Sequence, residues 1–168
     1  MEEASTVGEV AMSIPRINTA LDDYQAEFQL TMIKYEGMIA KQHVFVLFDL
    51  GASLSYVSSK VVEKCQSVSI KFSKPWLVKL ATGTKRKVNA KTERCPITIY
   101  GQPIYVDLNI LPLGSYDILI GMDWLEKCWS LVDCKQKIVS FVSESGQWRE
   151  LKGIKSNTKL HPITANQL

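Results

Sequence analysis

The sequence predicts an all-β domain with one or two short helices, and three observations support this prediction. Apolar segments rich in β-branched and aromatic residues begin at Gln29 and recur as far as residue 142. Short turn-forming stretches separate these segments. Within the predicted domain, only residues 58–65 and 122–127 have the character of short helices, and a further short helix is possible at 17–28. We therefore expect a flexible linker over residues 1–28, a folded domain over 29–143, and a C-terminal linker over 144–168 with at most one extra strand.

The apolar segments form a series of predicted hairpins. Residues 44–48 are apolar at every position, which is typical of a strand that is buried on both faces. In residues 104–111 apolar side chains alternate with polar ones, which predicts one buried face. Ser58 or Ser59 is expected to cap the first helix. The predicted strands are 30–35, 38–40, 44–48, 77–80, 84–88, 97–100, 104–111, 117–120, 131–133 and 138–142, with the extra strand at 148–151.

The composition argues against several classes of protein. With 46% apolar and 22% charged residues, the chain has the balance of a globular domain. A net charge of +3 is lower than a dedicated nucleic-acid binder usually carries, so we do not expect this domain to bind nucleic acid. The run of Lys85, Arg86 and Lys87 is interpreted as a solvated loop tip, with a nuclear targeting signal as the alternative. No apolar run approaches the ~18 residues of a membrane span, so no membrane partner is expected.

The cysteines and the first residues predict the cellular compartment. None of the four cysteines forms a C-x-x-C pair, so we expect no metal site and no cofactor. The first residues lack the apolar core of a signal peptide. Both observations favour an intracellular, cytoplasmic chain with free thiols, and a nuclear location is the alternative. Cys65 and Cys128, near the ends of the predicted helices, are expected to be small buried side chains.

Asp49 is the first candidate for chemistry. It follows the apolar run 44–48, and a carboxylate at the end of a buried strand is costly unless other groups satisfy it. Gly51 permits a tight turn, and Ser53 offers a hydroxyl nearby. Two interpretations remain open at this point. Asp49 either caps its own turn through its side chain, or it is a functional carboxylate.

A family resemblance bears on this choice. Residues 48–53, Phe-Asp-Leu-Gly-Ala-Ser, resemble the D-[ST]-G-A-[ST] signature of retropepsin-like aspartic proteases. Residues 80–83, Leu-Ala-Thr-Gly, resemble the flap that folds over the substrate in this family. Residues 116–125 resemble its second hydrophobic-glycine motif, here Ile120 and Gly121, with the helix that follows. Residues 108–117 are similar to proteases of plant gypsy-type LTR retrotransposons, and the whole resemblance covers about residues 29–143.

The resemblance implies a fold, an activity and a partner. The fold is the half-barrel of acid proteases, and the active enzyme is a homodimer that cleaves a polypeptide, the polyprotein of a retroelement. Each copy contributes Asp49, and the two carboxylates share one proton because both cannot ionise so close together. The resemblance assigns the active-site loop to Leu50, Gly51, Ala52 and Ser53, and the substrate-binding flap to Ala81, Thr82 and Gly83.

Leu50 departs from the family pattern, which has Thr or Ser at this position. In the family, that hydroxyl bonds to the other subunit across the dimer axis, whereas leucine has no donor or acceptor. Two lost bonds, one from each copy, cost about 2–6 kcal/mol if their partners stay buried. The alternative function is therefore a decayed, protease-like dimerisation or interaction module. A third interpretation, a nucleic-acid-binding β-barrel, rests only on residues 84–88.

Four other polar or aromatic residues are given structural interpretations. His43 is expected to be solvated at a turn. Asp123 is interpreted as an acid in the first turn of its helix, where the helix dipole favours it. Trp124 and Trp129 are interpreted as anchors of the core or of the dimer.

Overall fold

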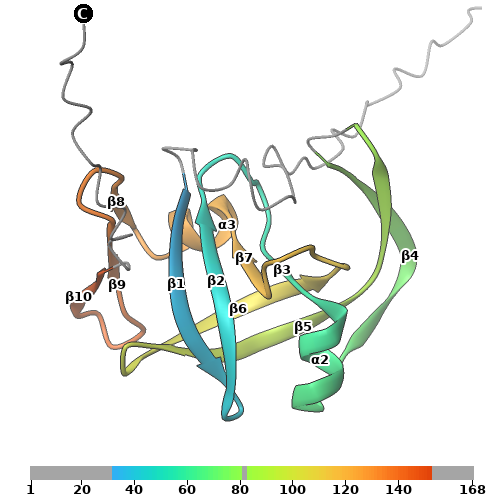
Figure 1. The fold of residues 1–168 in the computed structure, drawn as a ribbon, viewed down its shortest axis with the longest axis horizontal. Coiled ribbons are helices and arrows are strands. Elements are labelled where there is room, and N and C mark those ends of the chain that lie inside the picture. Colours follow the sequence, from blue (N-terminus) through green and yellow to red (C-terminus); the bar gives the residue numbers. More distant parts are fainter. Residues whose placement is uncertain (1–31, 81–82, 153–168) are drawn as a thin grey trace, which may run out of the picture.

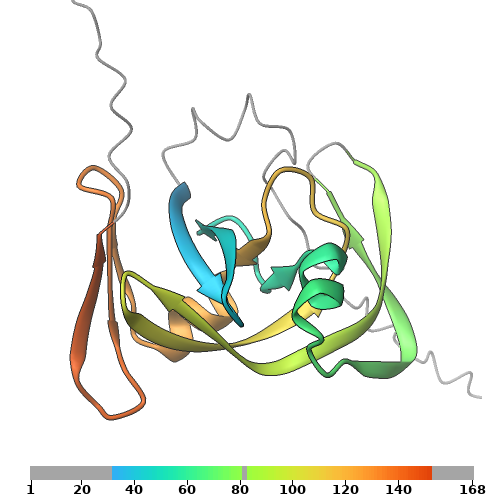
Figure 2. The ribbon, with the colours of Figure 1, turned by 60° about the horizontal axis from the view of Figure 1, so that its bottom comes forward.

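The computed structural model describes residues 32–80 and 83–152, and these form two β-sheets with two short helices (Figures 1 and 2). The predicted N-terminal linker lies outside the described residues. The larger sheet has the strand order β1-β2-β7-β3-β6-β5-β4, with a further pairing between β1 and β5, and the smaller has the order β10-β9-β8. The elements are β1 (Met32–Ile39), β2 (Gln42–Asp49), β3 (Tyr56–Val57), α2 (Ser59–Cys65), β4 (Ile70–Lys79), β5 (Lys85–Ile99), β6 (Gln102–Ile110), β7 (Ile118–Ile120), α3 (Met122–Lys127), β8 (Leu131–Asp133), β9 (Ile138–Val142) and β10 (Trp148–Lys152).

The first hairpin joins β1 and β2 through a tight turn at Ala40 and Lys41. Both residues have positive φ angles, 45° and 68°, which suits the twist of a two-residue hairpin turn. The sequence predicted a break within β1, but the strand is continuous through Gly37. A Cβ at this glycine would lie 3.0 Å from the carbonyl oxygen of Thr98, where β1 meets β5. Gly37 therefore permits the close approach of a neighbouring strand.

The β4–β5 hairpin is longer than the sequence predicted. The strands were expected to cover only 77–80 and 84–88, but β4 begins at Ile70 and β5 extends to Ile99. Many side chains in the added parts are charged and exposed, so the apolar pattern of a strand is missing there. The hairpin forms a long, curved ribbon at one side of the molecule (Figure 1).

Strand β7 lies between β2 and β3 in the larger sheet. It runs parallel to β2, with Val46 opposite Ile118 and Phe48 opposite Ile120, and antiparallel to β3. All residues of β7 are buried, as the uninterrupted apolar run predicted. Because β7 is parallel to β2, both strands end at the same edge of the sheet. The loop after β2 and the start of α3 therefore lie side by side.

Two apolar clusters form the core. The larger one joins β1, β2, β6 and β7 to α3, β9 and β10. Trp124 belongs to it, which confirms its interpretation as a core residue, whereas Trp129 is 77% exposed and is not in the core. Cys65 and Cys128 are only partly buried, because they lie at the rim of this cluster. The smaller cluster lies between the β4–β5 hairpin, the loop after β2 and residues 111–116.

Strand β10 is part of the folded unit. It pairs with β9, and its Leu151 is 1% exposed in the larger cluster. The hydroxyl of Tyr35 in β1 donates a hydrogen bond to the carbonyl oxygen of Leu151 at 2.8 Å. The extra strand expected at 148–151 is thus present, and the packed structure continues beyond residue 143.

Candidate active site

Asp49 is the last residue of β2, and its side chain is fully buried. The backbone N–H of Gly51 donates to its Oδ1 at 2.8 Å, and the N–H of Ala52 donates to its carbonyl oxygen at 3.3 Å. This is the side-chain-capped turn that the sequence left open. The turn does not exclude a functional role. It fixes the orientation of the carboxyl group, as catalysis by a carboxylate requires.

Gly121 brings the second glycine motif against the loop that contains Asp49. A Cβ at this position would lie 2.6 Å from the carbonyl oxygen of Ala52 and closer still to that of Leu54, so only glycine fits. The next two residues bind the same loop. Met122 N–H donates to Ala52 O at 2.8 Å, and Asp123 N–H donates to Ser53 O at 3.1 Å. The first turn of α3 therefore holds the loop through backbone groups.

Ser55 and Asp123 complete this attachment, and the sequence analysis missed their contact. The Ser55 hydroxyl donates to Asp123 Oδ1 at 2.6 Å, and the Ser55 N–H donates to Oδ2 at 3.1 Å. The hydroxyl also accepts a hydrogen bond from Gly121 N–H at 3.0 Å. Asp123 does lie in the first turn of α3, as predicted. Its carboxylate, however, also ties the loop to the helix.

The other predicted loop residues have different environments. Ala52 is fully buried in the smaller apolar cluster, whereas the side chain of Ser53 is exposed. Leu50 is partly exposed and packs against the larger cluster. The hydroxyl that the sequence placed near Asp49 was that of Ser53. The hydroxyl that organises the loop is that of Ser55, which lies two residues further along.

The predicted flap lies at the tip of the β4–β5 hairpin. Ala81 and Thr82 lie outside the described residues. On either side of them, Leu80 N–H donates to Thr84 O at 2.8 Å, and Gly83 N–H donates to Leu80 O at 2.9 Å. Gly83 has a φ of 86°, which favours glycine. In Figure 1 this tip is at the same end of the molecule as the end of β2.

Apolar packing joins the base of the flap to the loop. Leu80 belongs to the smaller cluster together with Ala52 and Tyr56. The Tyr56 hydroxyl is buried and has no hydrogen-bond partner in this structure. Burial raises the pKa of this hydroxyl well above its usual value, and the nearby charge of Asp123 raises it further. Tyr56 is therefore a neutral donor beneath the flap.

One cavity among the described residues lies away from this site. A cavity of about 450 Å³ is bounded by the start of β6, the end of α3 and the end of β9, with Trp129 and Tyr105 among its lining residues. No residue of the loop 49–55 lines it. Its volume therefore does not identify the candidate active site, which is defined by the loop, the second glycine motif and the flap.

The described residues contain neither a cluster of metal ligands nor a membrane-spanning helix. In residues 32–80 and 83–152, no three His, Cys, Asp or Glu side chains are placed to hold a metal ion. None of the helices in these ranges has the length and apolar character needed to cross a membrane.

The fold and the site define a class of protein, the acid proteases with one aspartate loop per chain. Comparison with solved structures supports the fold. The retroviral protease-like domain of Ddi1 from Leishmania major superposes with a TM-score of 0.57 at 18% sequence identity, covering 77% of this chain and 99% of that domain. At this identity the match shows the fold alone.

Sequence comparison then gives the family. The sequence model of the retroviral aspartyl protease family matches residues 13–147, which is well over half of the chain. The chain therefore belongs to the retroviral aspartyl protease family. A search among curated proteins found no match.

Proposed function

We propose that this chain is an aspartic endopeptidase that acts as a homodimer, with Asp49 from each copy as the catalytic residue. The observation that carries the proposal is the environment of Asp49. This carboxyl group is buried at the end of β2, in a loop that is hydrogen-bonded to the second glycine motif. Membership of the retroviral aspartyl protease family supports a role for these residues in peptide hydrolysis.

The proposed mechanism needs two copies of Asp49 at a twofold axis. The two carboxyl groups share one proton, and their apparent pKa values belong to the pair. The ionised carboxylate accepts a proton from a water molecule, which attacks the carbonyl carbon of the peptide bond. The protonated partner donates a hydrogen bond to the carbonyl oxygen. The hydrogen bond from Gly51 to Asp49 supports this role, because it orients the carboxyl group before the substrate binds.

The proposed substrate is the polyprotein of a retrotransposon of the plant gypsy type, and the proposed location is the cytoplasm or the nucleus. The resemblance of residues 108–117 to that group supports the proposed substrate. Cleavage would occur within the flanking segments of the polyprotein. The two walls of the binding groove would come from the two subunits and their flaps.

Self-processing tests this function. The full chain is expressed between its flanking polyprotein segments, as wild type, as Asp49→Asn and as Glu150→Gln. The last variant is a control that removes one exposed carboxylate from β10. We expect wild type and Glu150→Gln to be cleaved at acidic pH and high concentration, and Asp49→Asn to stay intact. Cleavage of all three, or of none, would contradict the proposal.

A second candidate is an inactive dimerisation module, and the position of Leu50 favours it. This side chain cannot form the hydrogen bond that Thr or Ser forms across the family's dimer axis. It packs instead against the larger apolar cluster of its own chain. The two candidates differ in one result, because the inactive module would associate without cleaving any peptide.

A further inference from the structure

Positive charge is concentrated in one part of the chain. Residues 59–91 contain nine Lys or Arg residues and one acid, Glu63, so this segment has a net charge of +8. The whole chain has a net charge of +3, so the remaining residues carry −5. The run at 85–87 accounts for only three of the nine cations. The small net charge of the whole chain is therefore the sum of a strongly basic segment and an acidic remainder.

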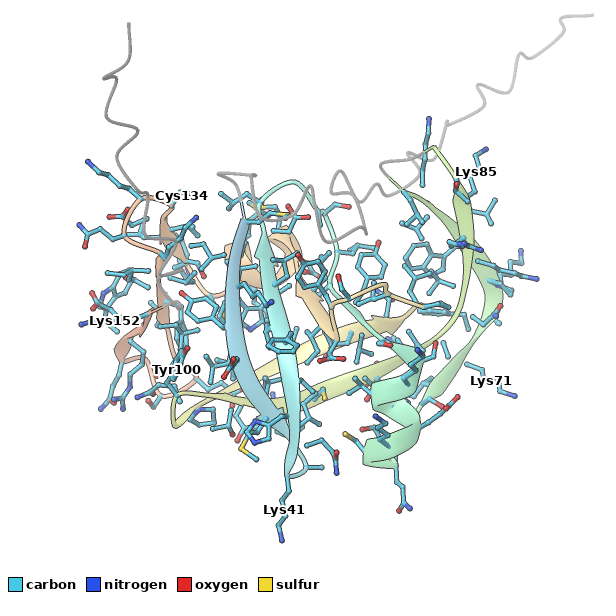
Figure 3. The ribbon with its side chains drawn as sticks, viewed as in Figure 1. Lys41, Lys71, Lys85, Tyr100, Cys134 and Lys152 are labelled. Atoms are coloured by element: carbon cyan, nitrogen blue, oxygen red, sulfur yellow. The ribbon has the colours of Figure 1, made fainter. Side chains whose placement is uncertain are left out.

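The fold places these cations on α2 and on the β4–β5 hairpin, which follow one another and lie side by side in both ribbon views (Figures 1 and 2). Lys71 and Lys85 extend outward from opposite ends of the hairpin in Figure 3. We define this surface as the basic face. Its cations are Lys60, Lys64, Lys71, Lys74, Lys79, Lys85, Arg86, Lys87 and Lys91. Within β5, Lys85 and Lys87 point to one side of the hairpin and Arg86 points to the other.

The cations of the basic face are mostly exposed and unpaired. All but Lys79 and Lys91 are exposed. Of these nine cations, only Lys91 forms an ion pair with a described residue, Glu93, at 2.6 Å. The strand register also places Lys79 directly opposite Lys85, and like charges in such a pair destabilise a sheet. Except for Lys91, these charges form no ion pair among the described residues and are therefore available to an external anion.

We propose that the basic face binds the phosphodiester backbone of a nucleic acid, without preference for sequence. Alternate residues in a strand, such as Lys85 and Lys87, are about 6.6–6.8 Å apart. This spacing is close to twice the ~3.4 Å rise between phosphates of one strand. The hairpin is curved and twisted, so its cations follow a flexible chain of phosphates better than the plane of an anionic membrane (Figure 1). The site needs neither Asp49 nor a second copy of the chain.

Fluorescence anisotropy with a labelled single-stranded oligonucleotide of about 20 nucleotides tests this proposal. The full chain is titrated at several salt concentrations between about 50 and 200 mM. The test variant is the triple substitution Lys71→Gln, Lys85→Gln and Lys87→Gln. The control is Lys41→Gln, Lys135→Gln and Lys152→Gln, which makes the same change in net charge away from the hairpin. In Figure 3 Lys152 lies on the other side of the molecule from the β4–β5 hairpin, and Lys41 lies at the tip of the β1–β2 hairpin.

The wild type should bind with an affinity that falls steeply as salt increases. The test variant should lose roughly tenfold or more in affinity, and the slope of log K against log salt should fall by about 2, because each phosphate contact on a single strand contributes about 0.7. The control should stay close to wild type. The thermal midpoint of the test variant should equal or exceed that of wild type, because Lys85→Gln removes the repulsion from Lys79.

Three outcomes would overturn the proposal. The first is equal loss of binding in both triple variants. The second is binding that disappears only together with the folded state, seen as a lower thermal midpoint. The third is tighter binding to polyglutamate or to vesicles containing phosphatidylserine than to the oligonucleotide, which would assign the basic face to an acidic protein or to a membrane. None of these measurements depends on peptidase activity.

Discussion

At the scale of single residues, Ser55 holds more of the candidate site together than any residue of the predicted signature. Its hydroxyl links Gly121 to Asp123, and its carbonyl oxygen accepts hydrogen bonds from the backbone and the side chain of Asn109. It is fully buried. The loop that contains Asp49 is therefore fixed to the end of β6 and to the start of α3, which both lie far from it in sequence.

Replacement of Ser55 by alanine should destabilise the protein. The change leaves the Gly121 N–H without its hydroxyl acceptor and removes one of the two hydrogen bonds to Asp123 Oδ1, which costs about 1–3 kcal/mol in the free energy of unfolding. Ser53→Ala is the matched control, because its exposed side chain should contribute less than about 0.5 kcal/mol. Urea unfolding followed by circular dichroism measures both. Equal effects of the two substitutions would contradict the assigned role of Ser55.

Tyr56 should make the free energy of unfolding fall at alkaline pH. Its pKa is raised in the folded state above the value of 10.0 in the unfolded chain, chiefly by burial. The resulting stabilisation is fully present below pH 10 and is lost as the pH rises towards the folded pKa. Tyr56→Phe removes a buried hydroxyl without a partner, so at neutral pH it should leave the free energy of unfolding unchanged or raise it by about 1–3 kcal/mol. At alkaline pH the variant should lose less of its stability than wild type does.

Tyr35 provides the matched comparison for this prediction. Burial also raises its pKa, but its hydroxyl donates to the carbonyl oxygen of Leu151. Tyr35→Phe should therefore cost about 0.5–1.5 kcal/mol at neutral pH, opposite in sign to Tyr56→Phe. Denaturant unfolding at pH about 7 and about 11 distinguishes the two tyrosines. The same sign for both would mean that the Tyr56 hydroxyl has a partner in solution.

At the scale of elements, β10 belongs to the core and not to a linker. Leu151→Ala should cost about 2–5 kcal/mol, because it leaves a cavity in the larger cluster. Trp148→Ala on the same strand should cost much less, because Trp148 is 50% exposed. Thermal unfolding of both variants checks this expectation. A small effect of Leu151→Ala would show that β10 is not packed in solution.

The sequence predicted elements where the local signal was strong. The buried strands β2 and β7, the two helices and the hairpin β8–β9 were placed within a few residues, because apolar runs and turn residues mark them. The length of β4–β5 could not be predicted, because exposed lysines interrupt its apolar pattern. The contact between Ser55 and Asp123 also has no local signature, since the two residues are 68 positions apart. Trp129 is 77% exposed, so of the two roles predicted for it only that of a dimer anchor remains a prediction.

At the scale of the whole molecule, we expect the side chain at position 50 to determine how tightly two chains associate. Leu50→Thr restores the hydroxyl of the family signature, so it should tighten dimerisation by roughly 30-fold to 10⁴-fold, the equivalent of about 2–6 kcal/mol. Leu77→Thr, at an exposed position on β4, is the control. Sedimentation velocity over a range of protein concentrations measures both. Identical association of Leu50→Thr and wild type would show that this position does not limit dimerisation.

The position of β7 between β2 and β3 determines when the loop around Asp49 can be completed during protein synthesis. Gly121 and Asp123, which form hydrogen bonds with this loop, are translated long after it. Contacts between such distant parts of a chain form slowly. A growing chain on the ribosome that ends before β7 lacks this central strand and both of these residues. The order of translation thus delays any proteolysis by the candidate site, because no copy can hold Asp49 in its final position until most of the domain has emerged.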